Sequence, residues 1–189
     1  MRQYTKEHIV TKTIELAEKK PLTKITVKEI AQESGVTRNA FYYYFHDIFD
    51  VFTYYIDSHI QELIDRPYGG NVEGIFFDLI EMLLRHKRLW QNLYKTLGHE
   101  ELERITASKL EELIKLAVNR IEPNFSIPGL DLEIICTFYR KALFGIFIEW
   151  MMDRRHDSDE QIRASLERIR TIFNGQIELI LMNCRRSCE

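Results

Sequence analysis

The sequence has little cysteine, proline or glycine, and it has no long apolar run. Its 189 residues include 3 Cys, 4 Pro and 8 Gly. No stretch approaches the roughly 18 apolar residues that a membrane-spanning helix needs, and the first ten residues, MRQYTKEHIV, lack the apolar core of a secretory signal. An odd number of cysteines without a C-x-x-C pair does not fit a disulfide framework. We therefore expect a cytosolic protein with reduced thiols.

The common catalytic motifs are also missing. The segment HEELER at residues 99–104 begins like a metalloprotease helix, but Glu103 occupies the position of the second His in H-E-x-x-H. The sequence has no phosphate-binding glycine loop and no G-x-S-x-G. It therefore predicts a protein that is not an enzyme and that uses no cofactor and no metal.

Helical periodicity recurs between the few Pro and Gly positions, whereas no sustained apolar/polar alternation typical of strands is present. Apolar residues make up 45% of the chain and charged residues 29%, which is ordinary globular composition. We predict an all-α protein. The expected helices cover residues 5–19, 27–34, a short segment after Thr37, 47–65, 72–88, 89–97, 99–121, 131–153 and 159–184.

Residues 25–45, ITVKEIAQESGVTRNAFYYYF, combine two short helices with a turn. Thr26 and Glu29 have the spacing of a capping box, which predicts a helix start at Thr26. Gly35 can adopt the left-handed conformation that ends this helix, and Thr37 can cap the next one. This order predicts a helix-turn-helix. We expect its interior to contain Ile30, Ala31, Val36, Ala40, Phe41 and Phe45, and its second helix to expose Thr37, Arg38, Asn39, Tyr42, Tyr43 and Tyr44.

The longer string ITVKEIAQESGVTRNAFYYYFHDIFDVF resembles the DNA-binding signature of the tetracycline-repressor (TetR) family. The shared features are Thr at the start of the first short helix, the Ile-Ala pair, Gly-Val in the turn, and an aromatic-x-x-Phe pattern. This resemblance implies a helix-turn-helix domain at residues 1–47 and a helical effector-binding and dimerisation domain at residues 48–189. The first half of the chain and the segment FGIFIEWMMDRR also resemble the dihydroxyacetone-kinase regulators of that family.

The side chains of the second short helix suit DNA recognition. Arg38 is expected to reach guanine and Asn39 adenine, because these pairings form two hydrogen bonds with base edges in the major groove. Tyr43 is expected to join them through its hydroxyl or a thymine methyl. A second group is expected to contact phosphates and position the helix: Thr26, Lys28, Thr37, Tyr42 and Tyr44. The family commonly has Lys where this chain has Ile48, so His46 is a candidate replacement for that phosphate contact.

Charge is distributed unevenly along the chain. Residues 1–46 hold eight Lys or Arg and five acidic residues, which gives +3, whereas the whole chain carries −3. The remaining residues 47–189 therefore carry −6. A basic segment at residues 1–46 followed by an acidic segment at residues 47–189 is typical of an anion-binding module that is joined to a second module with another role. A chance surplus on a solvated face would explain the same numbers.

Two late segments are apolar over more than one face, namely residues 134–152 and 162–182. A helix of this kind must bury both sides. We expect one side to meet its own core and the other to form a two-fold interface, which predicts a homodimer on a palindromic operator. A thicker monomeric core is the alternative. Five aromatic and polar side chains are candidates for binding a small-molecule effector: His86, Trp90, Tyr94, Phe138 and Tyr139.

These features predict a DNA-binding regulator, in the form of a repressor that a small molecule releases from double-stranded DNA. A helical co-regulator that acts through protein contacts and hardly binds DNA remains the alternative. The two differ in their dependence on Arg38 and Asn39, since only a DNA reader loses specific binding when these side chains change.

Overall fold

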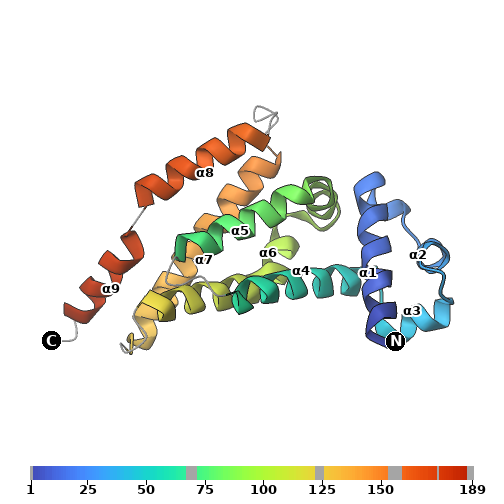
Figure 1. The fold of residues 1–189 in the computed structure, drawn as a ribbon, viewed down its shortest axis with the longest axis horizontal. Coiled ribbons are helices and arrows are strands. Elements are labelled where there is room, and N and C mark those ends of the chain that lie inside the picture. The colour runs from blue at the N-terminus through green and yellow to red at the C-terminus, as the bar shows by residue number, and fades with distance from the viewer. Residues whose placement is uncertain (1, 67–71, 122–125, 153–158, 174, 187–189) are drawn as a thin grey trace. The chain divides into compact units, whose positions relative to one another are not determined.

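The fold is described from a computed structural model, which covers residues 2–66, 72–121, 126–152, 159–173 and 175–186. Every regular element in these ranges is helical, as Figure 1 shows, so the all-α prediction is confirmed. The elements are α1 (Arg2–Lys19), the 3-10 turn η1 (Leu22–Lys24), α2 (Val27–Glu33), α3 (Arg38–Tyr44), α4 (Ile48–Asp65), α5 (Val72–Arg85), α6 (Lys87–Ile121), α7 (Gly129–Met152), α8 (Asp159–Phe173) and α9 (Gln176–Arg186).

The predicted helix starts agree with the observed capping bonds. The Thr26 hydroxyl accepts a hydrogen bond from the Glu29 N–H at 3.2 Å, and the Thr37 hydroxyl accepts one from the Ala40 N–H at 3.1 Å. At the start of α4 the Asp47 carboxylate accepts from the Asp50 N–H at 2.9 Å. Each bond satisfies a backbone donor that has no partner within its own helix. The sequence predicts Ser158 or Asp157 as the cap of the helix expected at 159–184, and both lie outside the described residues.

The end of the chain differs from the sequence prediction. One helix was expected over residues 159–184, but the structure has α8 and α9 with Gly175 between them at φ +74°. Glycine adopts this left-handed conformation without a steric penalty, so the helix ends there and a new one begins. The expected break near residue 98 is present, since Gly98 has φ 78° and ψ 178° inside α6.

The chain forms two compact units. The first comprises Met1–His59 and Arg85–Thr106, and the second comprises Ile60–Leu84 and Ala107–Glu189. These units do not follow the predicted division at residue 47, because the first half of α6 packs with the N-terminal helices. The division at residue 47 describes function and stays a prediction.

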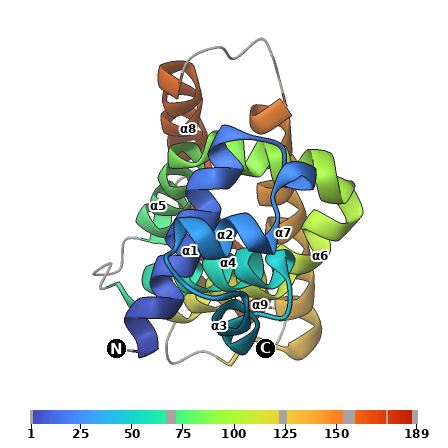
Figure 2. The same cartoon turned by 90° about the vertical axis from the view of Figure 1, so that its right-hand side faces the viewer.

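Each unit has its own apolar core. In the first unit, Ile9 and Ala17 of α1, Phe41 of α3 and Leu89 and Leu93 of α6 are fully buried. Figure 2 faces the side of this unit that carries α1, α2 and α3. In the second unit a buried cluster joins α6, α7 and α9 through Ile114, Val118, Ile135, Cys136 and Leu181. No helix within the described ranges has both the length and the apolar character needed to cross a bilayer.

Candidate nucleic-acid interface

The turn between α2 and α3 holds the two helices in a fixed relation. The Ser34 hydroxyl donates to the Ile30 carbonyl at 2.6 Å, and the Val36 N–H donates to the Ala31 carbonyl at 2.9 Å. Gly35 has φ +64°, as predicted, and a side chain there would meet nothing within 4 Å. The left-handed backbone, not a lack of space, is therefore what favours glycine at this position.

The apolar side of α3 anchors it in the first unit. Phe41 and Phe45 are buried at 0% and 2% exposure, and their rings lie 6.0 Å apart. Ile30 and Ala31 of α2 are buried as predicted, whereas Val36 and Ala40 are only half-buried. Half-burial suits their place at the edge of this small helix pair. The six predicted interior residues thus all contribute, but to different extents.

The opposite side of α3 is open to solvent. Arg38 and Asn39 are exposed, and Tyr42 and Tyr43 are 58% and 67% exposed. Tyr44 is half-buried, with its ring at 4.9 Å and 87° from that of Tyr43. An edge-to-face pair of this kind restricts both rings. The structure therefore leaves Arg38, Asn39 and Tyr43 accessible at the start and middle of α3, while Tyr44 also packs.

The remaining predicted phosphate contacts are exposed at helix starts near α3. Thr26 and Lys28 lie at the start of α2, Thr37 caps α3, and His46 precedes α4. The His46 N–H donates to the Asp50 carboxylate at 3.0 Å, so the backbone of this corner is held while the imidazole faces outward. Ile48, which occupies the position of the family's Lys, is half-buried.

A second set of contacts holds the α3–α4 corner against the first turns of α1. The Lys6 ammonium lies 3.6 Å from the ring centroid of Tyr54 and 5.3 Å from that of Phe45. The Tyr54 hydroxyl donates to the Glu7 carboxylate at 2.7 Å. Cations attract aromatic faces within about 6 Å. Sequence reasoning missed this cluster, because Glu7 and Tyr54 are 47 residues apart and neither belongs to a local motif.

The five effector candidates fall into both units. His86, Trp90 and Tyr94 belong to the first unit, and Phe138 and Tyr139 to the second. His86 is half-buried, and its Nδ1 lies 2.5 Å from a Glu18 carboxylate oxygen of α1. Its ring also meets that of Tyr55 edge-on at 5.7 Å. His86 thus has a partner within the protein, 68 residues away in the chain, which no local sequence pattern predicts.

The other four candidates differ in burial. Trp90 is 2% exposed, and Tyr94 is half-buried with its ring 6.4 Å from that of His99. Phe138 is 61% exposed on α7. Tyr139 packs against the buried cluster of the second unit, and this burial, followed by the nearby Glu178 carboxylate, raises the pKa of its phenol. Phe138 therefore lies on the surface of the isolated chain, while Trp90 lies in a core.

Among the described residues, no three His, Cys, Asp or Glu side chains are gathered in a way that could bind a metal ion.

Comparisons with known proteins agree with this geometry. Residues 9–53 match the family model described as bacterial regulatory proteins, tetR family, and residues 70–171 match a transcriptional regulator C-terminal region of the TetR type. Among solved structures, the chain is similar to DhaS, a dihydroxyacetone kinase operon activator, with 20% identity, a TM-score of 0.67 and 96% of each chain covered. It is also similar to a TetR transcriptional regulator from Rhodococcus sp. RHA1, with 17% identity, a TM-score of 0.63, and 95% of this chain and 98% of that chain covered. At these identities the likeness concerns the fold, and at that level the expected resemblance to dihydroxyacetone-kinase regulators is confirmed.

Proposed function

Because this chain belongs to the TetR family of transcriptional regulators, we propose that it binds a palindromic operator as a homodimer, with α3 of each subunit in the major groove. The observation that carries the proposal is the capped start of α3, where Arg38 and Asn39 are exposed beside the exposed Tyr43. Arg and Asn are the side chains that pair with guanine and adenine through two hydrogen bonds. The contacts with phosphates are proposed to come from six side chains at or near α2 and α3: Thr26, Lys28, Thr37, Tyr42, Tyr44 and His46.

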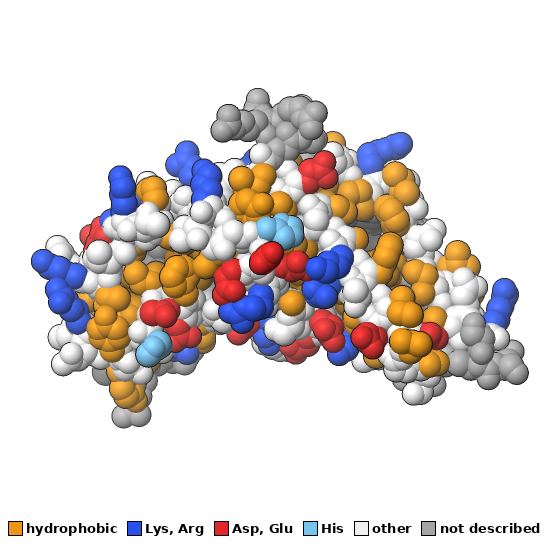
Figure 3. All heavy atoms as spheres, turned by 180° about the vertical axis from the view of Figure 1, so that it is seen from behind, with side chains coloured by type: hydrophobic (Ala, Val, Ile, Leu, Met, Phe, Trp, Pro, Cys, Tyr) orange, Lys and Arg blue, Asp and Glu red, His pale blue; other side chains and the backbone are white. Residues whose placement is uncertain are grey.

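The homodimer is proposed from apolar side chains that the isolated second unit leaves uncovered. Leu130, Ile134 and Phe138 form a stripe at four-residue spacing on α7 and are 69%, 57% and 61% exposed. Ile172 and Phe173 of α8 and Leu179 and Met182 of α9 are exposed as well. Figure 3 shows hydrophobic side chains reaching the surface in the part formed by the C-terminal helices. Soluble monomers rarely leave so much apolar surface open, which supports a second copy as its partner.

We further propose that a small molecule binds the helical body and lowers operator affinity, so that the protein acts as a repressor. The candidate contacts are His86, Trp90 and Tyr94 in the first unit and, taken separately, Phe138 and Tyr139 in the second. A ligand shifts the equilibrium only by its differential affinity for the two states. The alternative to repression is activation of transcription, and DhaS is named as an operon activator. A reporter gene behind the bound operator, with and without the regulator, distinguishes repression from activation.

Specific DNA binding is the first property to test. A duplex selected by the wild-type protein from a random library should bind in the presence of excess competitor DNA, since simple phosphate affinity is lost under competition. Asn39→Ala should weaken binding of that duplex by about 1–3 kcal/mol, roughly 5- to 150-fold, with little effect on non-specific binding. Fluorescence anisotropy at several salt concentrations measures both.

A pair of charge reversals separates base reading from general electrostatics. Arg38→Glu should abolish specific binding, whereas Arg88→Glu, an equal charge change at an exposed position on α6, should reduce it only slightly. If Arg38→Glu and Asn39→Ala both bind the selected duplex like the wild type, α3 does not read DNA. The protein would then fit the alternative of a co-regulator that acts through protein contacts.

A further inference from the structure

The C-terminal end of α1 depends on side chains from the region where α6 begins. Residue 21 is proline, which has no N–H, so the Ala17 carbonyl cannot receive the intrahelical bond that the next turn would supply. The Asn92 amide of α6 donates to this carbonyl at 2.7 Å and to the Lys20 carbonyl at 3.3 Å. Ala17 is fully buried, so no water replaces that donor.

Two charged contacts extend this joint to its neighbours. Glu18 of α1 pairs with His86, the residue between α5 and α6, at 2.5 Å. Lys20, which directly follows α1, forms an ion pair with Glu29 in the first turn of α2. The end of α1 is thus joined to the α6 region on one side and to the helix-turn-helix on the other. All of these residues belong to the first compact unit.

The N-terminal end of α1 holds the other side of the helix-turn-helix. There the Lys6 ammonium covers the rings of Tyr54 and Phe45, and Glu7 accepts the Tyr54 hydroxyl bond. Phe45 directly follows the last residue of α3 and has an extended backbone. A displacement of the first turns of α1 therefore acts on the residue at which the recognition helix ends.

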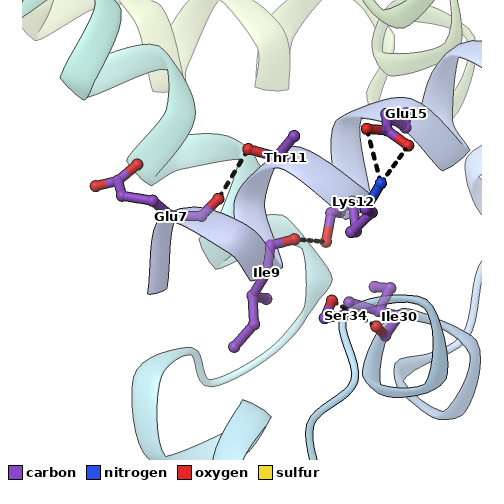
Figure 4. A network of polar contacts seen from close by, with 8 residues as sticks. Glu7, Ile9, Thr11, Lys12, Glu15, Ile30 and Ser34 are labelled. Carbon is purple, nitrogen blue, oxygen red and sulfur yellow. Dashed lines mark hydrogen bonds and ion pairs between the residues drawn. The ribbon is translucent and has the colours of Figure 1, made fainter. Parts of the chain in front are cut away.

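Between these two ends α1 runs without a break, and its own side chains bond along it. Figure 4 shows the Thr11 hydroxyl donating back to the Glu7 carbonyl at 2.9 Å and the Lys12 ammonium bound to both Glu15 carboxylate oxygens at 3.0 Å. The buried Thr13 hydroxyl donates to the Ile9 carbonyl at 2.8 Å. The 18 residues of α1 span about 27 Å as one uninterrupted helix, so continuous backbone hydrogen bonds connect its two ends.

We propose that α1 is a coupling helix, which transmits the position of α6 to the recognition helix α3, and that Asn92 and His86 are positioning residues for DNA binding. They contact no base or phosphate in this proposal and act through α1. The inference rests on the proposed function, because it assumes that α3 reads DNA. It also gives His86 a role that differs from effector binding: a ligand that displaced His86 from Glu18 would release one end of α1.

A double-mutant cycle across α1 tests the coupling. Asn92→Leu removes the donor at one end and keeps the side chain's size, and Tyr54→Phe removes only the hydroxyl that binds Glu7 at the other. Each single variant should bind the selected duplex about 2- to 10-fold more weakly, the range for one lost hydrogen bond. Because loosening either end frees the same helix, the double variant should bind about as weakly as the weaker single one.

Hydrogen exchange provides a readout that needs no DNA. In the full-length Asn92→Leu protein, amides of α3 and the corner at residues 38–46 should exchange faster, in addition to those at the end of α1. Thr96→Ala is the matched control, since the Thr96 hydroxyl bonds only along α6 to the Asn92 carbonyl at 2.8 Å. It should leave exchange at residues 38–46 unchanged. If Asn92→Leu does not fold, Glu18→Gln tests the same end of α1.

The outcomes separate the two proposals. If the wild type selects no duplex, the DNA-binding proposal fails, and the exchange measurement still decides the coupling. If the wild type binds a duplex but the two substitutions have multiplicative effects, and exchange changes only near residues 16–20, α1 does not couple α6 to α3. Non-additive affinities together with faster exchange at residues 38–46 support the coupling helix.

Discussion

Individual residues at the turn between α2 and α3 combine two roles. Thr26 and Thr37 each satisfy a backbone donor, and both remain exposed at positive helix ends where a phosphate is stabilised. Gly35 supplies the left-handed backbone between the two helices. The same residues that form the turn are therefore placed beside the surface proposed to meet DNA.

The reactivity of the Cys136 thiol tests how closely the core of the second unit is packed. Cys136 is 3% exposed, and burial, followed by the nearby Glu111 carboxylate, raises the pKa of its thiol. Because the thiolate is the reactive form, a raised pKa and poor access both slow alkylation. In a Cys184→Ser/Cys188→Ser protein, iodoacetamide at pH 8 should modify Cys136 at least about tenfold more slowly in the folded than in the denatured state.

The raised pKa of the Cys136 thiol makes the free energy of unfolding depend on pH. The unfolded thiol loses its proton at lower pH than the folded one, so its contribution to stability is present below the unfolded pKa and is lost as the pH rises above it.

The alkylation test can contradict the packing around Cys136. Equal alkylation rates in folded and denatured protein would show that the cluster around Cys136 is open. Mass spectrometry of the alkylated peptide measures the rates.

Residues with local signals were predictable, and those with distant partners were not. Thr26, Gly35 and Thr37 follow from spacing within a few residues, and the structure has Thr26 and Thr37 as helix caps and Gly35 in the turn. Asn92 and His86 contact α1 across 75 and 68 residues of sequence. Nothing in the neighbourhood of either residue specifies such a partner, so only the folded arrangement could assign it.

At the scale of elements, α3 is a seven-residue helix whose stability depends on its ends. Isolated helices of this length are unstable in water, so capping and tertiary packing must hold it. Thr37→Ala should lower the free energy of unfolding by about 1 kcal/mol, because the Ala40 N–H loses its acceptor. Thr37→Ser keeps the hydroxyl and should have less than half that effect.

Urea denaturation followed by circular dichroism measures this difference. A comparable loss in both variants would mean that the methyl group, and not the cap, stabilises the start of α3. Since Thr37 is also a proposed phosphate contact, the serine variant should retain operator affinity as well as stability.

Helix positions were predicted better than helix boundaries. Residues 27–34 and 47–65 correspond closely to α2 and α4, where Thr26, Gly35 and Asp47 mark the ends. The single helix predicted at 159–184 is wrong, because Gly175 has a left-handed backbone that separates α8 from α9. Burial of Phe41 and Phe45 was predictable from helical spacing, whereas the partial burial of Val36 and Ala40 depends on how closely the small helices approach.

For the whole molecule, the uncovered apolar residues of α7, α8 and α9 predict self-association. Phe138→Glu places a charge at one end of the exposed stripe of α7, and a two-fold interface contains this change twice. The dimer dissociation constant should rise by on the order of 100-fold or more, given the cost of removing two buried phenyl groups. Ser108→Glu, at an exposed position on α6, is the control and should leave it unchanged.

Analytical ultracentrifugation over a range of concentrations measures this constant. Operator affinity should also fall for Phe138→Glu, because two separate monomers must then bind the two half-sites of the palindrome independently. A wild-type protein that sediments as a monomer at micromolar concentration would contradict the proposed dimer, and the exposed stripe would then need another partner.

The proline after α1 has a practical consequence for protein engineering. A chimaera could join the head of this chain to the body of another regulator within α4. Here a head cut at residue 59 would leave behind Asn92, which supplies the donor that Pro21 withholds from the Ala17 carbonyl. A working chimaera must therefore transplant the first half of α6 together with the N-terminal helices, or replace Pro21 with a residue that restores the missing bond.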